Sequence, residues 1–164
     1  MCIRDRVRTA APGSPAAEVR LSGLDGADVV GVRLARDGTR AALLVRQGSR
    51  RSLYLTRVVR SGSTVTLSGP RRVESRVSDA VDVAWGSASR LVVLGSDGAG
   101  PDQAFLVDIG QGSTRPIGAP ASPRTVAAAP NRLVLIGGDG NRVWQYQSGR
   151  WLAGVEGSSP TYPG

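Results

Sequence analysis

Histidine and lysine are absent from this chain of 164 residues, and cysteine occurs once. Ser-His-Asp and Cys-His nucleophilic catalysis both need an imidazole base, so these enzyme classes are excluded within this stretch. Lysine bases and zinc sites made of clustered cysteine and histidine are excluded for the same reason. The single Cys2 cannot form an internal disulfide, so it does not report the redox compartment. We predict no catalytic residue, no metal ligand, no cofactor and no enzymatic activity.

Aromatic residues and long apolar runs are also scarce. No run approaches the roughly 18 residues of a membrane-spanning helix, and no signal peptide opens the chain. Aromatics are only 4% of the residues, so the 40% hydrophobic content must build its core from small aliphatic side chains. Twenty-two glycines and ten prolines lie between the short apolar runs, which favours many turns over long helices.

The net charge of +8 comes entirely from arginine. A nucleic-acid site concentrates cations on one face with aromatics between them, whereas these arginines are scattered. We therefore predict no nucleic-acid partner, and steep salt dependence of binding would favour that rival. The acidic residues lie mostly in or beside Asp-Gly turns, where a side-chain oxygen caps the turn, which disfavours calcium binding and paired-carboxylate catalysis.

The stretch from Val30 to Val45 shows how the chain is built. Large apolar residues alternate before a turn at Asp37-Gly38, and a second apolar run follows. Alternation has the period of a strand, and an Asp-Gly dipeptide supplies the positive φ angles of a tight hairpin turn. This stretch is predicted to be a β-hairpin.

The hairpin recurs along the chain. Its second strand begins at Arg40, Arg90 and Arg132, so the copies are spaced by 50 and 42 residues (90 − 40 and 132 − 90). All-strand repeats of this period are typical of propeller blades. The alternative is three unrelated hairpins in a β-sandwich. We predict an all-β fold, a partial β-propeller of about three four-stranded blades plus a remnant strand.

The strands of each blade follow from the apolar runs and the turns between them. We expect them at 29–35, 41–46, 52–59 and 64–73, then at 80–85, 90–94, 104–109 and 114–117, and finally at 125–128, 133–137, 143–146 and 151–155. Residues 18–21 are predicted to be the outermost strand of a preceding blade. Propellers close with about four to eight blades, so we expect a fragment whose missing blades lie N-terminal.

The opening of the chain is excluded from this fold. Met1 to Arg6 resembles an adapter-derived leader, and an Ala/Pro/Gly/Ser-rich stretch follows it. We predict that residues 1–17 are a non-native leader and linker, and that residues 18–164 form the C-terminal blades of a β-propeller.

Three charged residues are the candidates for partner binding: Arg33, Asp82 and Arg124. If the lead-in strands of the repeats are equivalent, Arg33 and Asp82 occupy the same place on adjacent blades, on inner strands near the central channel. Two interpretations stay open, an inter-blade ion pair that fixes packing and a binding site at the channel mouth. The three tryptophans, Trp85, Trp144 and Trp151, are predicted to pack between blades.

Several ordered elements of the sequence resemble a known family. They are LARDGTRAA at 34–42, VSDAVDVAW at 77–85, LVVLG at 91–95, AAAP at 127–130 and the terminal Tyr162-Pro163-Gly164. From about Glu18 onward, this set is similar to the C-terminal β-propeller of the LpqB family of actinobacterial lipoproteins. The Arg-Asp-Gly-Thr-Arg element alone is shared with TolB-type propellers, whereas the ordered set and the ending are more specific.

The resemblance implies a parent protein with a signal peptide, a lipidated cysteine and a GerMN-type domain before the propeller. Such a protein lies on the outer face of the cytoplasmic membrane through its lipid anchor, which this stretch lacks. The family is associated with the MtrA–MtrB two-component system, so the implied partner is the extracytoplasmic domain of the sensor histidine kinase. The family offers no catalytic residues that could be assigned to positions of this sequence. The alternative is a ligand-binding or hydrolytic propeller for carbohydrate or peptide whose active site lies in the missing blades.

Overall fold

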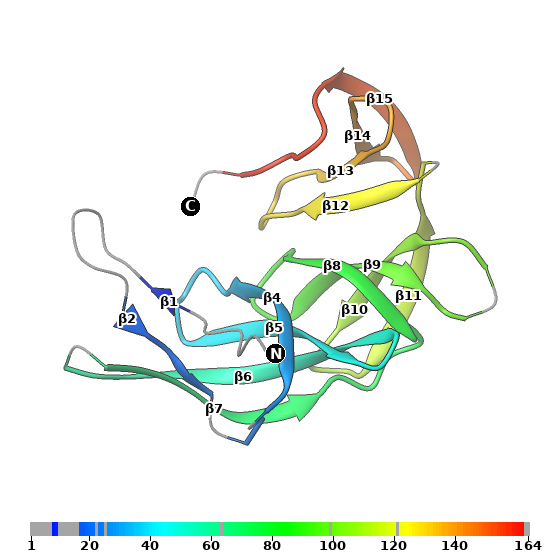
Figure 1. Ribbon diagram of the computed structural model, residues 1–164. Helices are drawn as coiled ribbons and strands as arrows, with labels where there is room; N and C mark the ends of the chain where they lie inside the picture. The colour runs from blue at the N-terminus through cyan, green and yellow to red at the C-terminus, as the bar shows by residue number, and fades with distance from the viewer. Residues whose placement is uncertain are drawn as a thin grey trace.

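The structure, a computed structural model, describes residues 8–9, 17–21, 23–24, 26–62, 64–98, 100–120 and 122–162. Fifteen strands and no helix are found in this part of the chain. The three main sheets lie one after another in the order of the sequence (Figure 1). The described residues accordingly contain no helix that could span a membrane. Cys2 and most of the predicted leader lie outside the described residues.

Each of the twelve predicted blade strands is present, which confirms the partial propeller. The first sheet contains β4 (Asp28–Leu34), β5 (Arg40–Gln47), β6 (Arg50–Ser61) and β7 (Thr64–Arg72). The second contains β8 (Asp79–Trp85), β9 (Arg90–Ser96), β10 (Gln103–Asp108) and β11 (Ser113–Gly118). The third contains β12 (Pro123–Ala127), β13 (Val134–Gly138), β14 (Arg142–Gln147) and β15 (Arg150–Glu156). Within each, consecutive strands pair antiparallel from the inner strand outward.

The remnant strand lies elsewhere than the sequence predicts. Strand β3 (Arg20–Leu21) does not belong to a preceding blade, because it pairs in parallel with β7 as the fifth strand of the first sheet. An open edge strand offers free N–H and C=O groups that a passing segment can pair with. Before it, β1 (Arg8–Thr9) pairs antiparallel with β2 (Ala17–Glu18). The boundary between residues 17 and 18 stays a prediction.

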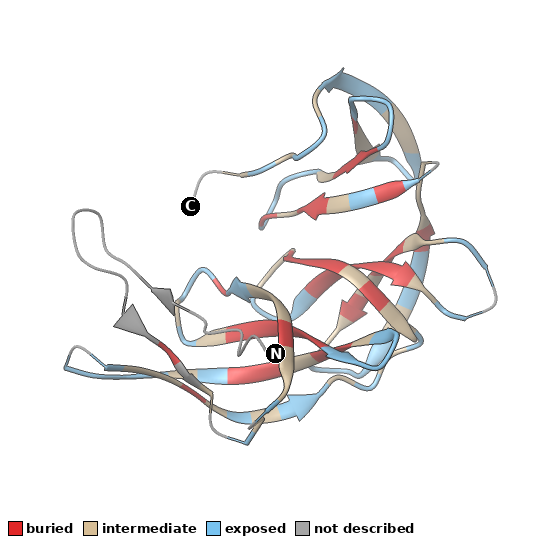
Figure 2. Cartoon of the chain, viewed as in Figure 1, coloured by how far each residue is buried: buried red, intermediate tan, exposed pale blue. Residues whose placement is uncertain are grey.

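The core lies between the faces of successive sheets. Strand β5 is buried on both sides (Figure 2) because its residues alternate between two clusters. Leu44 packs toward the second sheet, in a cluster with Phe105 and Trp85. Leu43 packs in a cluster on the opposite face with Leu67. A third cluster joins the second and third sheets. Each main sheet contains four consecutive strands, and the sheets stack in series through their faces. This is the arrangement of propeller blades, so the alternative of a β-sandwich is excluded.

The inner strands of the three blades share one irregularity. The ladders of β4 with β5, β8 with β9 and β12 with β13 each shift register once, after Val29, Ala80 and Pro123. Such a bulge leaves one residue unpaired and bends the strand. The residue that resumes each ladder is Gly31, Asp82 or Thr125, so these three occupy equivalent places.

Candidate functional site

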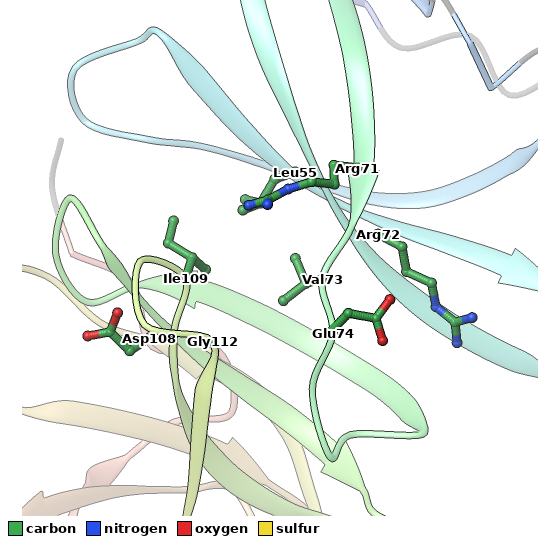
Figure 3. A pocket seen from close by; sticks show the side chains of 8 residues that line it. All are labelled: Leu55, Arg71, Arg72, Val73, Glu74, Asp108, Ile109 and Gly112. Atoms are coloured by element: carbon green, nitrogen blue, oxygen red, sulfur yellow. The ribbon is translucent and has the colours of Figure 1, made fainter.

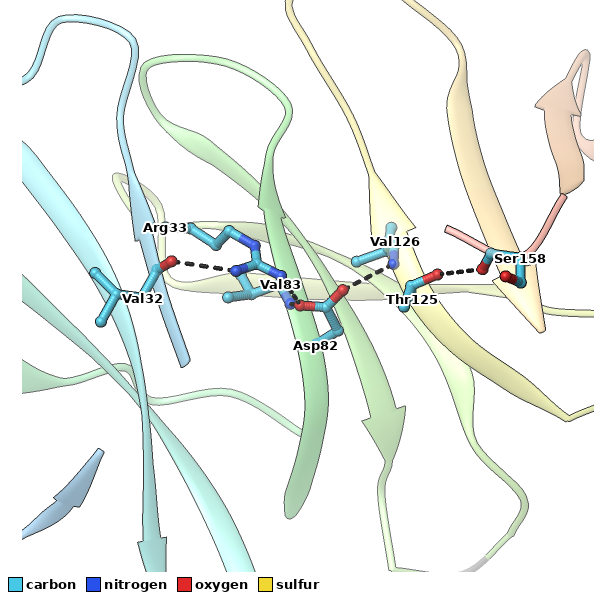
Figure 4. Close-up of polar contacts among 7 residues, drawn as sticks. All are labelled: Val32, Arg33, Asp82, Val83, Thr125, Val126 and Ser158. Atoms are coloured by element: carbon cyan, nitrogen blue, oxygen red, sulfur yellow. Dashed lines mark hydrogen bonds and ion pairs between the residues drawn. The ribbon is translucent and has the colours of Figure 1, made fainter. Parts of the chain in front are cut away.

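Asp82 joins the inner strands of all three blades. Its carboxylate Oδ1 accepts hydrogen bonds from Arg33 Nη2 on β4 and from the backbone N–H of Val83, both at 2.9 Å. Its Oδ2 accepts one from the backbone N–H of Val126 on β12, also at 2.9 Å. Figure 4 shows the carboxylate between the inner strands, with Arg33 on one side and Val126 on the other. The Asp82 side chain is only 10% exposed, and a buried carboxylate needs such donors to offset its lost hydration.

The predicted inter-blade ion pair between Arg33 and Asp82 is thus confirmed, but the predicted equivalence of their positions is wrong. Leu34 pairs with Ala41 and Trp85 with Leu91, so these inner-strand residues correspond. Arg33 is therefore equivalent to Ala84, two positions from Asp82. The turn between the inner and second strands is one residue longer in the first blade. Aligning Ala35 with Ala84 in the sequence therefore gives the wrong correspondence between the two inner strands.

Arg33 contributes a second inter-blade contact through its backbone. Its carbonyl accepts a hydrogen bond of 2.8 Å from Trp85 Nε1. Between the next two blades, Trp151 Nε1 donates to the Ile117 carbonyl at 3.0 Å. Both tryptophans pack in clusters between blades, as predicted. Trp144 is half-buried and belongs to neither of these two clusters.

Arg124, the third candidate, lies on β12 and does not contact Asp82. Its guanidinium pairs with Asp139, with Nη2 and Oδ2 3.1 Å apart. The hydrogen bonds from Arg124 lower the pKa of the Asp139 carboxyl, and Asp139 in turn raises the pKa of Arg124. The structure therefore brings Arg33 and Asp82 together, whereas Arg124 forms a separate pair within the third blade.

A second inter-blade ion pair, between Arg51 and Asp79, has no counterpart among the residues predicted from the sequence. Arg51, at the start of β6, donates to Asp79 on β8 from its backbone N–H at 2.8 Å and from Nε and Nη2, both at 3.1 Å. These hydrogen bonds lower the pKa of the Asp79 carboxyl. The residues are 28 positions apart, and no local pattern in the sequence signals the pairing.

The C-terminal segment lies against the inner strand of the third blade. Ser158 accepts a hydrogen bond of 3.0 Å from Thr125 Oγ1, and Tyr162 donates one of 2.8 Å to the Leu133 carbonyl. Burial raises the pKa of the Tyr162 hydroxyl. Thr125 on β12 is equivalent to Asp82 on β8. The C-terminal segment therefore lies beside β12 in the same way that β12 lies beside β8. The inner strands and this segment are thus linked in series (Figure 4).

Two of the candidate side chains are exposed cations. Arg33 has 49% of its side chain exposed, and Arg124, in its separate pair with Asp139, has 69%. Across the described part of the chain, no three Asp, Glu, His or Cys side chains are grouped so that they could hold a metal ion. The arrangement supplies fixed guanidinium groups, which recognise carboxylates and phosphates.

Comparisons with known proteins agree with this architecture. A family model described as the lipoprotein LpqB β-propeller domain matches residues 2–163. Lipoprotein LpqB from Streptomyces coelicolor is 35% identical over 90% of this chain and 25% of its own length. Lipoprotein LpqB from Thermobifida fusca is 34% identical over 90% of this chain and 24% of its own length. The chain thus spans about a quarter of these relatives.

A solved structure with the same fold belongs to a puromycin hydrolase mutant complexed with PGG. It superposes with a TM-score of 0.62 over 84% of this chain and 24% of its own. Sequence identity is 19%, so the likeness concerns the fold.

Proposed function

Because the chain belongs to the family of lipoprotein LpqB β-propeller domains, we propose that it is a non-enzymatic protein-interaction module of a cell-surface lipoprotein. In this proposal the partner is the extracytoplasmic domain of a sensor histidine kinase in an MtrA/MtrB-type two-component system, whose activity the propeller modulates. A lipid anchor elsewhere in the parent protein holds the propeller at the outer face of the cytoplasmic membrane. Family membership carries the proposal, and the inner-strand arginines give it a physical basis.

Arg33 and Arg124 are exposed and yet held in place. Asp82 holds Arg33 from the adjacent blade, and Asp139 holds Arg124 within its own sheet. A side chain that is already ordered loses little conformational entropy on binding. Arginine is also enriched among the residues that dominate binding energy at protein interfaces. We assign these two side chains to the contact with the kinase domain, where they would face acidic or carbonyl groups.

The test measures binding of the 164-residue chain to the purified extracytoplasmic domain of the kinase by calorimetry. The Arg33→Gln/Arg124→Gln double variant is expected to lower the affinity at least about tenfold, because two interface arginines each contribute on the order of 1 kcal/mol or more. The control is Arg142→Gln/Arg150→Gln, which removes the same charge from exposed positions on β14 and β15. It should bind like the parent chain.

Two results would contradict the proposal. In the first, the kinase domain does not bind the parent chain at all. In the second, both double variants lose affinity equally, which would mean that overall charge and not the inner-strand site attracts the kinase domain. Thermal unfolding of each variant, monitored by circular dichroism, shows whether the variant is still folded, so that a loss of affinity is not confused with a loss of structure.

A further inference from the structure

A pocket lies between the first two blades, and Asp82 is not among its lining residues. Its volume of about 720 Å³ suits a small molecule. Strands β5, β6 and β7 form one wall, and the β8–β9 and β10–β11 turns form the other. The charged residues in its lining are Arg40, Arg57 and Arg71, and none of the lining residues is acidic. A neighbouring hollow, drawn in Figure 3, shares Arg71, Leu55 and Ile109 with it.

Two of these arginines oppose each other in the sheet. Arg40 on β5 and Arg57 on β6 are direct cross-strand partners, so their side chains share the face that looks toward the second blade. Like charges placed directly opposite destabilise a sheet. Arg40 is partly compensated by Asp37, at 3.4 Å, and by the ring of Trp85. The guanidinium of Arg57 has no hydrogen-bonded or ion-paired partner among the described residues.

A bulge brings the third arginine to the same face. Arg57 pairs with Ser68 and Leu55 with Arg71, so β7 has one residue more than β6 between these two pairs. In a regular strand Arg71, three residues after Ser68, would point to the opposite face. The bulge, with Gly69 at φ +59°, restores Arg71 to the face of Arg57. Figure 3 shows Arg71 reaching over the hollow while Arg72 points away.

The guanidinium of Arg71 also lacks a hydrogen-bonded or ion-paired partner within the described part of the chain. The pocket therefore collects two uncompensated guanidinium groups beside a third, together with the hydroxyl groups of Ser68 and Ser89. Guanidinium forks match the oxygens of phosphate and carboxylate groups, and a phosphate monoester carries about −1.5 to −2 charges near pH 7. Its charge balances the two free arginines, whereas one carboxylate balances only one of them.

We infer that this inter-blade pocket binds a small ligand bearing a phosphate group, held by Arg57 and Arg71, with the rest of the pocket accommodating the attached group. The unfavourable pairing of Arg40 with Arg57 is then relieved on binding. The ligand is either a soluble phosphate compound or the phosphate-monoester headgroup of an anionic lipid, since both present the same oxygens and charge.

The test titrates the 164-residue chain with inorganic pyrophosphate by calorimetry and follows the arginine Nε–H resonances by NMR. Arg57→Gln/Arg71→Gln is expected to weaken binding at least about tenfold, since two charge-assisted contacts are lost. Arg142→Gln/Arg150→Gln, with the same net charge, should bind like the parent chain. Arg57→Lys keeps the charge but not the planar fork, so we expect an intermediate affinity.

A second arm adds vesicles of phosphatidylcholine with or without phosphatidic acid, a lipid whose headgroup is a phosphate monoester. Binding of the phosphatidic acid vesicles that needs Arg57 and Arg71 identifies a lipid headgroup, whereas pyrophosphate binding without vesicle binding identifies a soluble ligand. The inference is overturned if pyrophosphate leaves the Arg57 and Arg71 resonances unmoved, or if both double variants lose affinity equally. The Arg57→Gln/Arg71→Gln variant should unfold at no lower temperature than the parent, because it removes a like-charge pair.

Discussion

Asp82 accepts a hydrogen bond from the backbone N–H of Val126, so a side chain of the second blade satisfies a buried donor of the third. The same carboxylate holds Arg33 of the first blade. Three inner strands that are distant in sequence are therefore held by one residue. This is what a propeller requires, since its blades contact one another by their faces and do not pair edge to edge.

Replacing Asp82 with alanine should lower the free energy of unfolding by about 3 kcal/mol, because it leaves the Val126 N–H buried without a partner and Arg33 without its counter-ion. Urea denaturation measures this. Asp28→Ala removes a surface pair with Arg46, whose atoms lie 3.3 Å apart, and should cost less than about 1 kcal/mol. Equal costs for the two variants would mean that Asp82 has no special role between blades.

The Arg51–Asp79 pair predicts an acid-sensitive fold. Its contribution to stability is complete above the ordinary Asp pKa of 3.8, because the unfolded carboxyl is ionised there too. It is lost as the pH falls below that value through the lowered pKa of the folded state. Arg51→Gln should therefore weaken the pH dependence of unfolding below pH 3.8. Parallel pH profiles for the parent and Arg51→Gln would contradict the assignment.

Gly95 is required by the close approach of β8. An added Cβ would overlap the backbone carbonyl of Asp79, so Gly95→Ala should destabilise the chain by about 1–3 kcal/mol. Gly100 has open space around it, and Gly100→Ala should be neutral or slightly stabilising. Thermal unfolding of the two alanine variants distinguishes these effects, and equal midpoints would rule out the steric argument.

Gly137 leaves room for the C-terminal segment in the same way. A Cβ there would overlap the backbone of Ser158, so Gly137→Ala should displace the segment and break its bond with Thr125. Amide hydrogen exchange of residues 157–162 is expected to accelerate, with little change in β9. Gly86→Ala, where a Cβ would meet only ordinary contacts at 3.5 Å and beyond, is the control. Unchanged exchange in Gly137→Ala would show that the segment is held by other contacts.

Local pattern was sufficient to predict the blade strands. Alternating apolar residues and turn dipeptides such as Asp37-Gly38 act over a few residues, and they predicted all twelve strands to within two residues at each end. The absence of histidine and lysine is read directly from the sequence, and within this stretch it leaves no imidazole or lysine amine to act as a base. These conclusions needed only the period of a strand and the chemistry of side chains.

Only the tertiary structure decided which residues meet. Alternation repeats every two residues, so a shift of two positions keeps each side chain on its face; the pattern could not reveal that Arg33 corresponds to Ala84. The parallel pairing of β3, the Arg51–Asp79 contact and the placement of Arg71 by a bulge all depend on how sheets stack and where ladders shift. The sequence alone determined the strands and their faces, whereas the contacts between blades depend on long-range geometry that no local period encodes.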